Sequence, residues 1–204
     1  MINNAGVAYN NDSKAPFAEQ ARVSVEANFF GTRRVCAVLF PLLRKGARVV
    51  NVTSNCGHLS KISGAEPAAT DLRARLASKG LMEEDLVEMM AEFVKLAGDN
   101  KHVECGWPNS AYKVSKVGVS ALSIVQQRVM DEERGKEDIV INHAHPGFVD
   151  TDMSSHKGHR SVEEGAKSIV FAATLPPNTD IRGQYIWEDS TVTSWVEEKV
   201  KLVY

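Results

Sequence analysis

The chain has 204 residues, 43% apolar and 25% charged, which suits one folded domain and excludes a disordered, collagen-like or linker protein. Its 24 basic and 26 acidic side chains give a formal net charge of -2, so composition gives no reason to expect binding to nucleic acid or to an anionic membrane. Three widely spaced cysteines form neither a disulfide framework nor a Cys-x-x-Cys metal motif, and no apolar run approaches the ~18 residues of a membrane span. We therefore expect a cytoplasmic protein.

The first predicted element is a long helix over residues 18–44. Apolar and small side chains recur along it at spacings of three and four, which is typical of one buried helical face. They are Val25, Phe29, Thr32, Cys36, Leu39 and Leu43. Gly46 ends this helix, and the β-branched run of residues 47–53 then predicts a strand that is buried on both faces.

Residues 56–109 interrupt the alternation of strands and helices, because this segment is too long for an ordinary connection. It has a helical periodicity of its own, carried by Met82, Leu86, Met89, Phe93 and Leu96. We expect an insertion whose helix packs on the main domain, with Gly106-Trp107-Pro108 returning the chain to it.

The rest of the chain predicts a helix over residues 110–134, a strand over 139–144, a further helix, and a strand over 184–187. The further helix opens with a Ser161 to Glu164 capping box and stops at Pro176-Pro177. Its expected buried face consists of Val162, Ala166, Ile169 and Ala173. Strands that alternate with helices indicate an α/β fold with an open parallel sheet and right-handed crossovers, in a single domain spanning residues 1–204.

Ligands of such sheets bind at the carboxyl ends of the strands. Ser54 directly follows the first strand, and the residues that follow the second are Pro146, Gly147, Val149 and Thr151. Tyr112 and Lys116, four residues apart, leave the same face of the helix over residues 110–134. A lysine ammonium near a phenol would lower the tyrosine pKa from its usual ~10, as a proton donor to an alkoxide requires.

This spacing is common by chance, so its weight comes from other motifs in a fixed order. They are Asn3-Asn4-Ala5-Gly6, Asn28-Phe29-Phe30-Gly31-Thr32, Val50-Asn51-Val52-Thr53-Ser54, Ser110-Ala111-Tyr112-Lys113-Val114-Ser115-Lys116 and Pro146-Gly147-Phe148-Val149-Asp150-Thr151-Asp152-Met153. In this order and spacing, over essentially its whole length, the chain resembles the short-chain dehydrogenase/reductase family. The insertion, the Gly106-Trp107-Pro108 approach and the Thr151-Asp152-Met153 ending make it similar to the monomeric NADPH-dependent carbonyl reductases of that family.

The resemblance implies a Rossmann-like fold and the NADPH-dependent reduction of ketones, aldehydes or quinones to alcohols. It implies that Tyr112 protonates the carbonyl oxygen and that Ser54 hydrogen-bonds the same oxygen. Lys116 would hold the nicotinamide ribose and keep Tyr112 acidic, while Asn28 would anchor a water that passes protons to Lys116. The implied catalytic residues are therefore Asn28, Ser54, Tyr112 and Lys116.

The resemblance also implies cofactor and substrate contacts. The cofactor residues would be Asn4, Ala5 and Gly6 on the ribose side, Tyr112 and Lys116, and Pro146, Gly147, Val149 and Thr151 around the carboxamide and a phosphate. Phe148, Met153 and Cys56 would face the substrate. The family needs no metal, and the inserted helix is expected to cover the helices that relatives use to tetramerise, so we expect a monomer.

The chain departs from the family pattern because it contains no Gly-x-x-x-Gly-x-Gly fingerprint. We expect an N-terminally truncated Rossmann-like sheet, with no strand ahead of the Asn-Asn-Ala-Gly motif and without the turn that binds pyrophosphate. The alternative function is a truncated non-catalytic remnant or interaction protein without competent cofactor binding. An epimerase or dehydratase that shares the Tyr-x-x-x-Lys spacing is disfavoured by the residues 146–152 motif and the insertion.

The single residues also have simpler interpretations. Ser54 would then only cap a strand end, Tyr112 and Lys116 would form an exposed helical pair, and Asn28 would be a solvated side chain. Cys56 is expected to be a partly buried, inert thiol rather than a reactive one. The histidines at positions 143, 145, 156 and 159 are expected to be ordinary polar residues, because they offer no third metal ligand at useful spacing.

Overall fold

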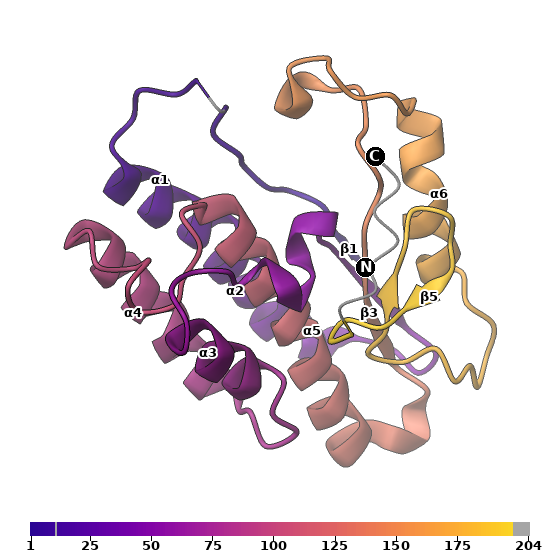
Figure 1. Cartoon of the computed structure of the whole chain (residues 1–204). Coiled ribbons are helices and arrows are strands. Elements are labelled where there is room, and N and C mark those ends of the chain that lie inside the picture. Colours follow the sequence, from indigo (N-terminus) through magenta and orange to yellow (C-terminus); the bar gives the residue numbers. More distant parts are fainter. Residues whose placement is uncertain (11, 198–204) are drawn as a thin grey trace.

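A computed structural model of the chain describes residues 1–10 and 12–197 (Figure 1). Its strands are β1 (Ile2–Asn3), β2 (Arg48–Val52), β3 (Val140–Ala144), β4 (Tyr185–Ile186) and β5 (Val192–Thr193). Its α-helices are α1 (Phe17–Ser24), α2 (Gly31–Leu39), α3 (Ala68–Leu76), α4 (Glu83–Gly98), α5 (Ala111–Arg134) and α6 (Val162–Ala173). A π-helix (Val25–Phe30) joins α1 to α2, and short 3-10 turns fill several connections. None of the helices in these described ranges is long and apolar enough to cross a membrane.

The five strands form one sheet in the order β1-β2-β3-β4-β5. β1 to β4 run parallel, and β5 pairs antiparallel with β4 at the edge. The predicted parallel α/β sheet is therefore confirmed, with one antiparallel edge strand that the sequence did not indicate. A short strand that the sequence did not indicate runs into the Asn-Asn-Ala-Gly motif, because Ile2 and Asn3 pair in register with Val50 and Asn51 of β2. A strand of two residues is too short to show alternation or a buried run.

Helices cover both faces of the sheet (Figure 1). On one face, Val49 of β2 packs with Ile141 of β3 and Met130 of α5. On the other face, Val50 packs with Ala172 of α6. Residues 49 and 50 are fully buried in opposite directions, which explains why β2 reads as a continuous apolar run.

The predicted first helix is present, but it is not a uniform α-helix. α1, the π-helix and α2 run on from one to the next, and in the π-helix the Gly31 N–H bonds to the carbonyl oxygen of Glu26, five residues back. Val25, Phe29, Thr32 and Cys36 are buried as expected. Leu39 is 37% exposed, contrary to prediction, because α2 ends there and a 3-10 turn of different periodicity follows.

The insertion contains α3 and α4 instead of a single helix. α4 packs against α1 and α5, with Leu86, Met89 and Phe93 buried in the main core, as predicted. Met82 is wrongly included in that face, because it precedes the first turn of α4 and is 58% exposed. α3 was missed because its short buried face, Ala69, Leu72 and Leu76, spans only two turns.

The helix α6 begins as predicted: Ser161 Oγ accepts from the Glu164 N–H, and Glu164 Oε2 accepts from the Ser161 N–H. The prediction of its buried face is right in part: Ile169 and Ala173 are partly buried and pack on the sheet, whereas Val162 is 59% exposed. The fully buried residues of the helix are Gly165, Ser168 and Ala172. Small residues are buried here because they let α6 approach the sheet closely, which allows Ser168 Oγ to donate to the carbonyl oxygen of His145.

Candidate active site

The carboxyl ends of β1, β2 and β3 lie side by side, because these strands are parallel and in register. The ladder continues past the ends of the strands, where the Thr53 N–H donates to the carbonyl oxygen of Ala144 at 2.8 Å. Ser54 and the segment that begins at Pro146 therefore leave the same edge of the sheet, as the sequence predicted.

Ser54 begins a 3-10 turn, Asn55–Gly57, at the end of β2. Its hydroxyl accepts from the Cys56 N–H and donates to Asn55 Oδ1, both at 3.2 Å. The same side chain lies near the phenol of Tyr112 and lowers the pKa of that phenol. Ser54 is thus both a strand-end cap and a partner of the predicted proton donor, so the two interpretations of this residue are compatible.

Tyr112 and Lys116 lie in the first two turns of α5, whose N-terminus is capped by Ser110. Lys116 is 4% exposed; its Nζ donates to the carbonyl oxygen of Val52 at 2.9 Å and lies 5.7 Å from the centroid of the Tyr112 ring. The interpretation as an exposed helical pair is therefore wrong. The ammonium group is held between strand β2 and the phenol.

The electrostatics of this pair differ from the expectation. Burial raises the pKa of Tyr112 to about 12, nearby Cys56 adds to the rise, and the Ser54 side chain opposes it. Burial also lowers the pKa of Lys116 to about 8. The predicted lowering of the tyrosine pKa is therefore wrong in direction for this chain, because desolvation of the phenol is the largest effect on its pKa.

Asn28 lies in the π-helix and is 1% exposed, so its interpretation as a solvated side chain is wrong. Its Oδ1 accepts from the Val7 N–H at 2.7 Å, and its Nδ2 donates to the Val7 carbonyl oxygen and to Ser115 Oγ, both at 2.9 Å. Ser115 Oγ in turn donates to the carbonyl oxygen of Tyr112 at 2.8 Å. Asn28 therefore ties the segment after β1 to the first turn of α5.

The Asn4-Ala5-Gly6 segment follows β1, with Asn4 and Ala5 exposed. A Cβ on Gly6 would lie 3.1 Å from Asn28 Oδ1 and 3.5 Å from Lys116 Nζ. Glycine thus leaves open the space next to the ammonium group. Lys116 has three N–H donors, and among the described residues only the Val52 carbonyl accepts one, so two remain for a polar ligand.

The segment after β3 turns sharply at Gly147, whose φ is +87°. Its N–H donates to Nδ1 of His145 at 3.2 Å, and a Cβ here would collide with Arg160 and with Glu188 Oε2 at 2.5 Å. Farther along, Val149 packs against α6 at Gly165. Pro146 and Thr151 are half-buried, while Phe148 and Met153 are 42% and 44% exposed.

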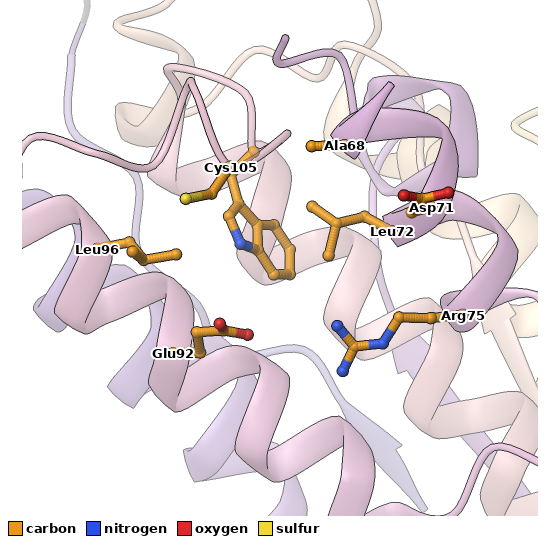
Figure 2. Close-up of a pocket in the computed structure, with 8 residues that line it drawn as sticks. Ala68, Asp71, Leu72, Arg75, Glu92, Leu96 and Cys105 are labelled. Atoms are coloured by element: carbon orange, nitrogen blue, oxygen red, sulfur yellow. The ribbon is translucent and has the colours of Figure 1, made fainter. Parts of the chain in front are cut away.

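A cavity of about 160 Å³ lies elsewhere, in the insertion. Figure 2 shows Arg75 on α3 and Glu92 on α4 facing its interior from opposite sides. Its lining consists of Ala68, Asp71, Leu72, Arg75, Glu92, Leu96, Cys105 and Trp107, and includes none of the predicted catalytic or cofactor residues.

The described ranges contain no cluster of three potential metal ligands among histidine, cysteine, aspartate and glutamate. His143 is fully buried and stacks on Tyr185 with 4.9 Å between ring centroids. His156 instead bonds to Asp150 and Asp152 on the surface. The three cysteines, Cys36, Cys56 and Cys105, are all free, and Cys56 is half-buried beside Tyr112 and Lys116.

The sequence did not indicate how the Ser54 turn is held. Thr53 Oγ1 donates to the carbonyl oxygen of Lys116 at 3.1 Å, and the Tyr185 hydroxyl donates to the carbonyl oxygen of Ser54 at 2.6 Å. Gly57 closes the turn against α5. The only sequence signal for this packing was a glycine three residues after Ser54, which by itself indicates no more than a turn.

Replacing Gly57 with alanine is expected to lower the free energy of unfolding by about 1–3 kcal/mol, because the added methyl group overpacks a filled space. Its Cβ would lie 2.8 Å from Ser120 Oγ, 3.0 Å from the Lys116 carbonyl oxygen, and closer still to Thr53 Oγ1. Urea unfolding measures the change. Gly98→Ala is the matched control, since no atom lies within 4 Å of a Cβ there. Equal stability of the two variants would contradict the packing described here.

The chain is similar to known oxidoreductases. It is 42% identical to "Carbonyl reductase [NADPH] 3" of Rattus norvegicus over 96% of the chain and 69% of that protein. It is 40% identical to "Carbonyl reductase [NADPH] 1" of Mus musculus over the same shares. Among solved structures, salutaridine reductase from Papaver somniferum matches with a TM-score of 0.76 and 26% identity over 90% of the chain and 70% of that protein. A scan of protein-family models finds no match.

Proposed function

Because the chain belongs to the NADPH-dependent carbonyl reductase family of the short-chain dehydrogenases/reductases, we propose that it reduces ketones, aldehydes or quinones to alcohols with NADPH. The observation that carries the proposal is a group of three side chains at the edge of the sheet: Ser54 acts on the Tyr112 phenol, and the buried Lys116 ammonium lies beside the Tyr112 ring. This is the arrangement that protonation of a carbonyl oxygen requires, with an acid, a second hydrogen-bond donor and a cation within reach of one another.

Tyr112 is the proposed proton donor. With a pKa raised to about 12, its phenol keeps its proton at neutral pH and is available to an oxygen that gains negative charge. Ser54 orients that oxygen by a hydrogen bond from its hydroxyl. Once the proton has left, the Lys116 ammonium stabilises the phenolate, a role that needs the lysine to be charged.

The proposed cofactor supplies the hydride when it is bound. The residues present fit its nicotinamide ribose, because Lys116 has N–H donors left over next to the space that Gly6 leaves open. Asn4 and Ala5 flank that space, and Pro146, Gly147, Val149 and Thr151 are the proposed contacts of the carboxamide and a phosphate.

Asn28 is proposed to assist proton supply to Lys116. Both of its amide N–H groups are used by Val7 and Ser115, so a water would bind to a free lone pair of Oδ1 or to the backbone carbonyl. Cys56 lies beside Tyr112 and Lys116, and together with Phe148 and Met153 it is proposed to face the substrate.

The proposal includes a monomeric, cytoplasmic protein. Support for a monomer is that α4 of the insertion covers part of α5 and α1, leaving less of these helices for a partner subunit. Support for a reducing compartment is the absence of disulfides among the three cysteines.

The direct test is to mix the protein with NADPH and a small quinone and to follow NADPH oxidation, with calorimetric titration of NADPH alone as a second measurement. We expect NADPH to bind and to be consumed only when quinone is present. Absence of binding by a chain that still unfolds cooperatively would favour the alternative, a non-catalytic remnant or interaction protein. Binding without turnover would reject Tyr112, Ser54 and Lys116 as a working site.

A further inference from the structure

The turn that carries Ser54 is held by the C-terminal part of the chain. At its start, the Tyr185 hydroxyl of β4 donates to the carbonyl oxygen of Ser54 at 2.6 Å. At its end, the indole N–H of Trp195 donates to the carbonyl oxygen of Gly57 at 2.7 Å. Both ends of the 3-10 turn are therefore fixed by residues more than 130 positions away in sequence, since the separations are 131 and 138.

The residues just after the turn bind the same segment. The Leu59 N–H donates to the carbonyl oxygen of Trp195 at 3.3 Å, so this tryptophan is held through both its backbone and its ring. His58 accepts the Ser60 N–H on Nδ1, which leaves the proton on Nε2, and Nε2 lies 3.2 Å from the carbonyl oxygen of Ser194. His58 is fully buried and Trp195 is 6% exposed, so these bonds are shielded from water.

The turn decides where the Ser54 hydroxyl lies, because that hydroxyl accepts from the Cys56 N–H inside the turn. On the side that faces α5, the turn cannot shift toward the helix, because Gly57 packs directly on Thr53, Ser120 and the Lys116 carbonyl. On its C-terminal side the turn is held by two side-chain hydrogen bonds, from Tyr185 and from Trp195, and a single substitution removes either of them. We propose that Trp195 is a positioning residue, which fixes the Ser54 hydroxyl against Tyr112 through the Gly57 carbonyl; the catalytic consequence rests on the function proposed above.

The test is Trp195→Phe, which keeps an aromatic ring in the core and removes the N–H donor. The amide of Cys56 is a direct reporter, since its N–H bonds to Ser54 Oγ at 3.2 Å. The amide of Glu164 is the internal reference, because it bonds to Ser161 Oγ with the same 3.2 Å spacing on α6. We expect hydrogen exchange at Cys56 to rise roughly 3- to 10-fold, the effect of losing one hydrogen bond from a local opening equilibrium, with no change at Glu164.

In the active protein, kcat for quinone reduction is expected to fall by a similar factor while KM for NADPH stays the same. Trp187→Phe is the matched control: this tryptophan is 7% exposed, lies between β4 and β5, and among the described residues makes no hydrogen bond to the Ser54 turn. It should leave the exchange of Cys56 unchanged. Should Trp195→Phe fail to fold, Tyr185→Phe removes the bond to the Ser54 carbonyl and is followed by the same readout.

Unchanged exchange at Cys56 would overturn the proposal, as would an equal rise at Cys56 and Glu164, which would mean that Trp195 only stabilises the fold. A rise at Cys56 with unchanged kcat in an active protein would overturn the catalytic role. If the unmodified protein neither binds nor oxidises NADPH, the proposed function fails, and the exchange measurement still decides whether Trp195 fixes the Ser54 turn.

Discussion

Replacing Tyr112 with phenylalanine is expected to lower kcat for quinone reduction by at least about 100-fold, the lower end of what a positioned general acid contributes. The substitution removes one hydroxyl from a side chain that lies near Ser54, with its ring centroid 5.7 Å from Lys116 Nζ. NADPH oxidation measured at saturating quinone gives the change in kcat.

The affinity for NADPH separates a chemical effect from a binding effect in this variant. Calorimetric titration should give a Kd changed by less than about 10-fold, since only one of the proposed ribose contacts is lost. Tyr9→Phe is the matched control, because that phenol bonds to Glu19 on the surface and takes no part in the proposed site. A Tyr112→Phe enzyme with kcat within twofold of the unmodified protein would show that the proton comes from another group.

The sequence predicted the elements that depend on local chemistry. The β-branched run of residues 47–53 and the Ser161 capping box required no knowledge of neighbours, and β2 and α6 appear where they were predicted. That Ser54 and the segment from Pro146 leave the same edge of the sheet followed from one topological rule, because parallel strands end together, whereas the meeting of Ser54 with Tyr112 was implied by the family resemblance. Site residues on strand ends and on one helical face were therefore predictable.

The buried face of α6 could not be fully predicted, because it depends on how closely the helix approaches the sheet. Val162 is the more hydrophobic choice for the buried face of α6, yet Gly165 and Ser168 occupy it because α6 lies close to Val149 and His145. The widened turn around Asn28 was likewise missed, since the residues of a π-helix keep nearly the same apolar spacing as those of an α-helix.

The pKa of Tyr112 shows the same limitation in electrostatic terms. Sequence spacing gives the distance to an ammonium group, but it gives no measure of desolvation, which is the larger effect on both side chains of the pair. Trp195 lay outside any motif, because its role depends on the end of the chain folding back onto the Ser54 turn. Sequence patterns therefore located the residues proposed for the site and missed the contacts that hold them.

Lys116→Met is expected to remove a pH dependence from the stability of the protein. In the folded chain burial lowers the Lys116 pKa from 10.5 to about 8. Between these values the unfolded chain binds more protons than the folded one, so the free energy of unfolding rises with pH across that window. Relative to Lys116→Met, the unmodified protein should gain about 2 kcal/mol between about pH 7 and about pH 9.5. Urea unfolding at a series of pH values measures it.

The upper limit of that window avoids Tyr112, whose raised pKa has the opposite effect: above about pH 10 the unfolded phenol ionises first and stability falls. Lys113→Met on the same helix is the control, because the Lys113 side chain is half-exposed. The stability of this variant should follow that of the unmodified protein at every pH. Parallel pH profiles for the unmodified protein and Lys116→Met would mean that the ammonium is as well solvated as in the unfolded chain. That result would contradict the proposed site, in which the Lys116 ammonium is buried against the Val52 carbonyl and lies beside the Tyr112 ring.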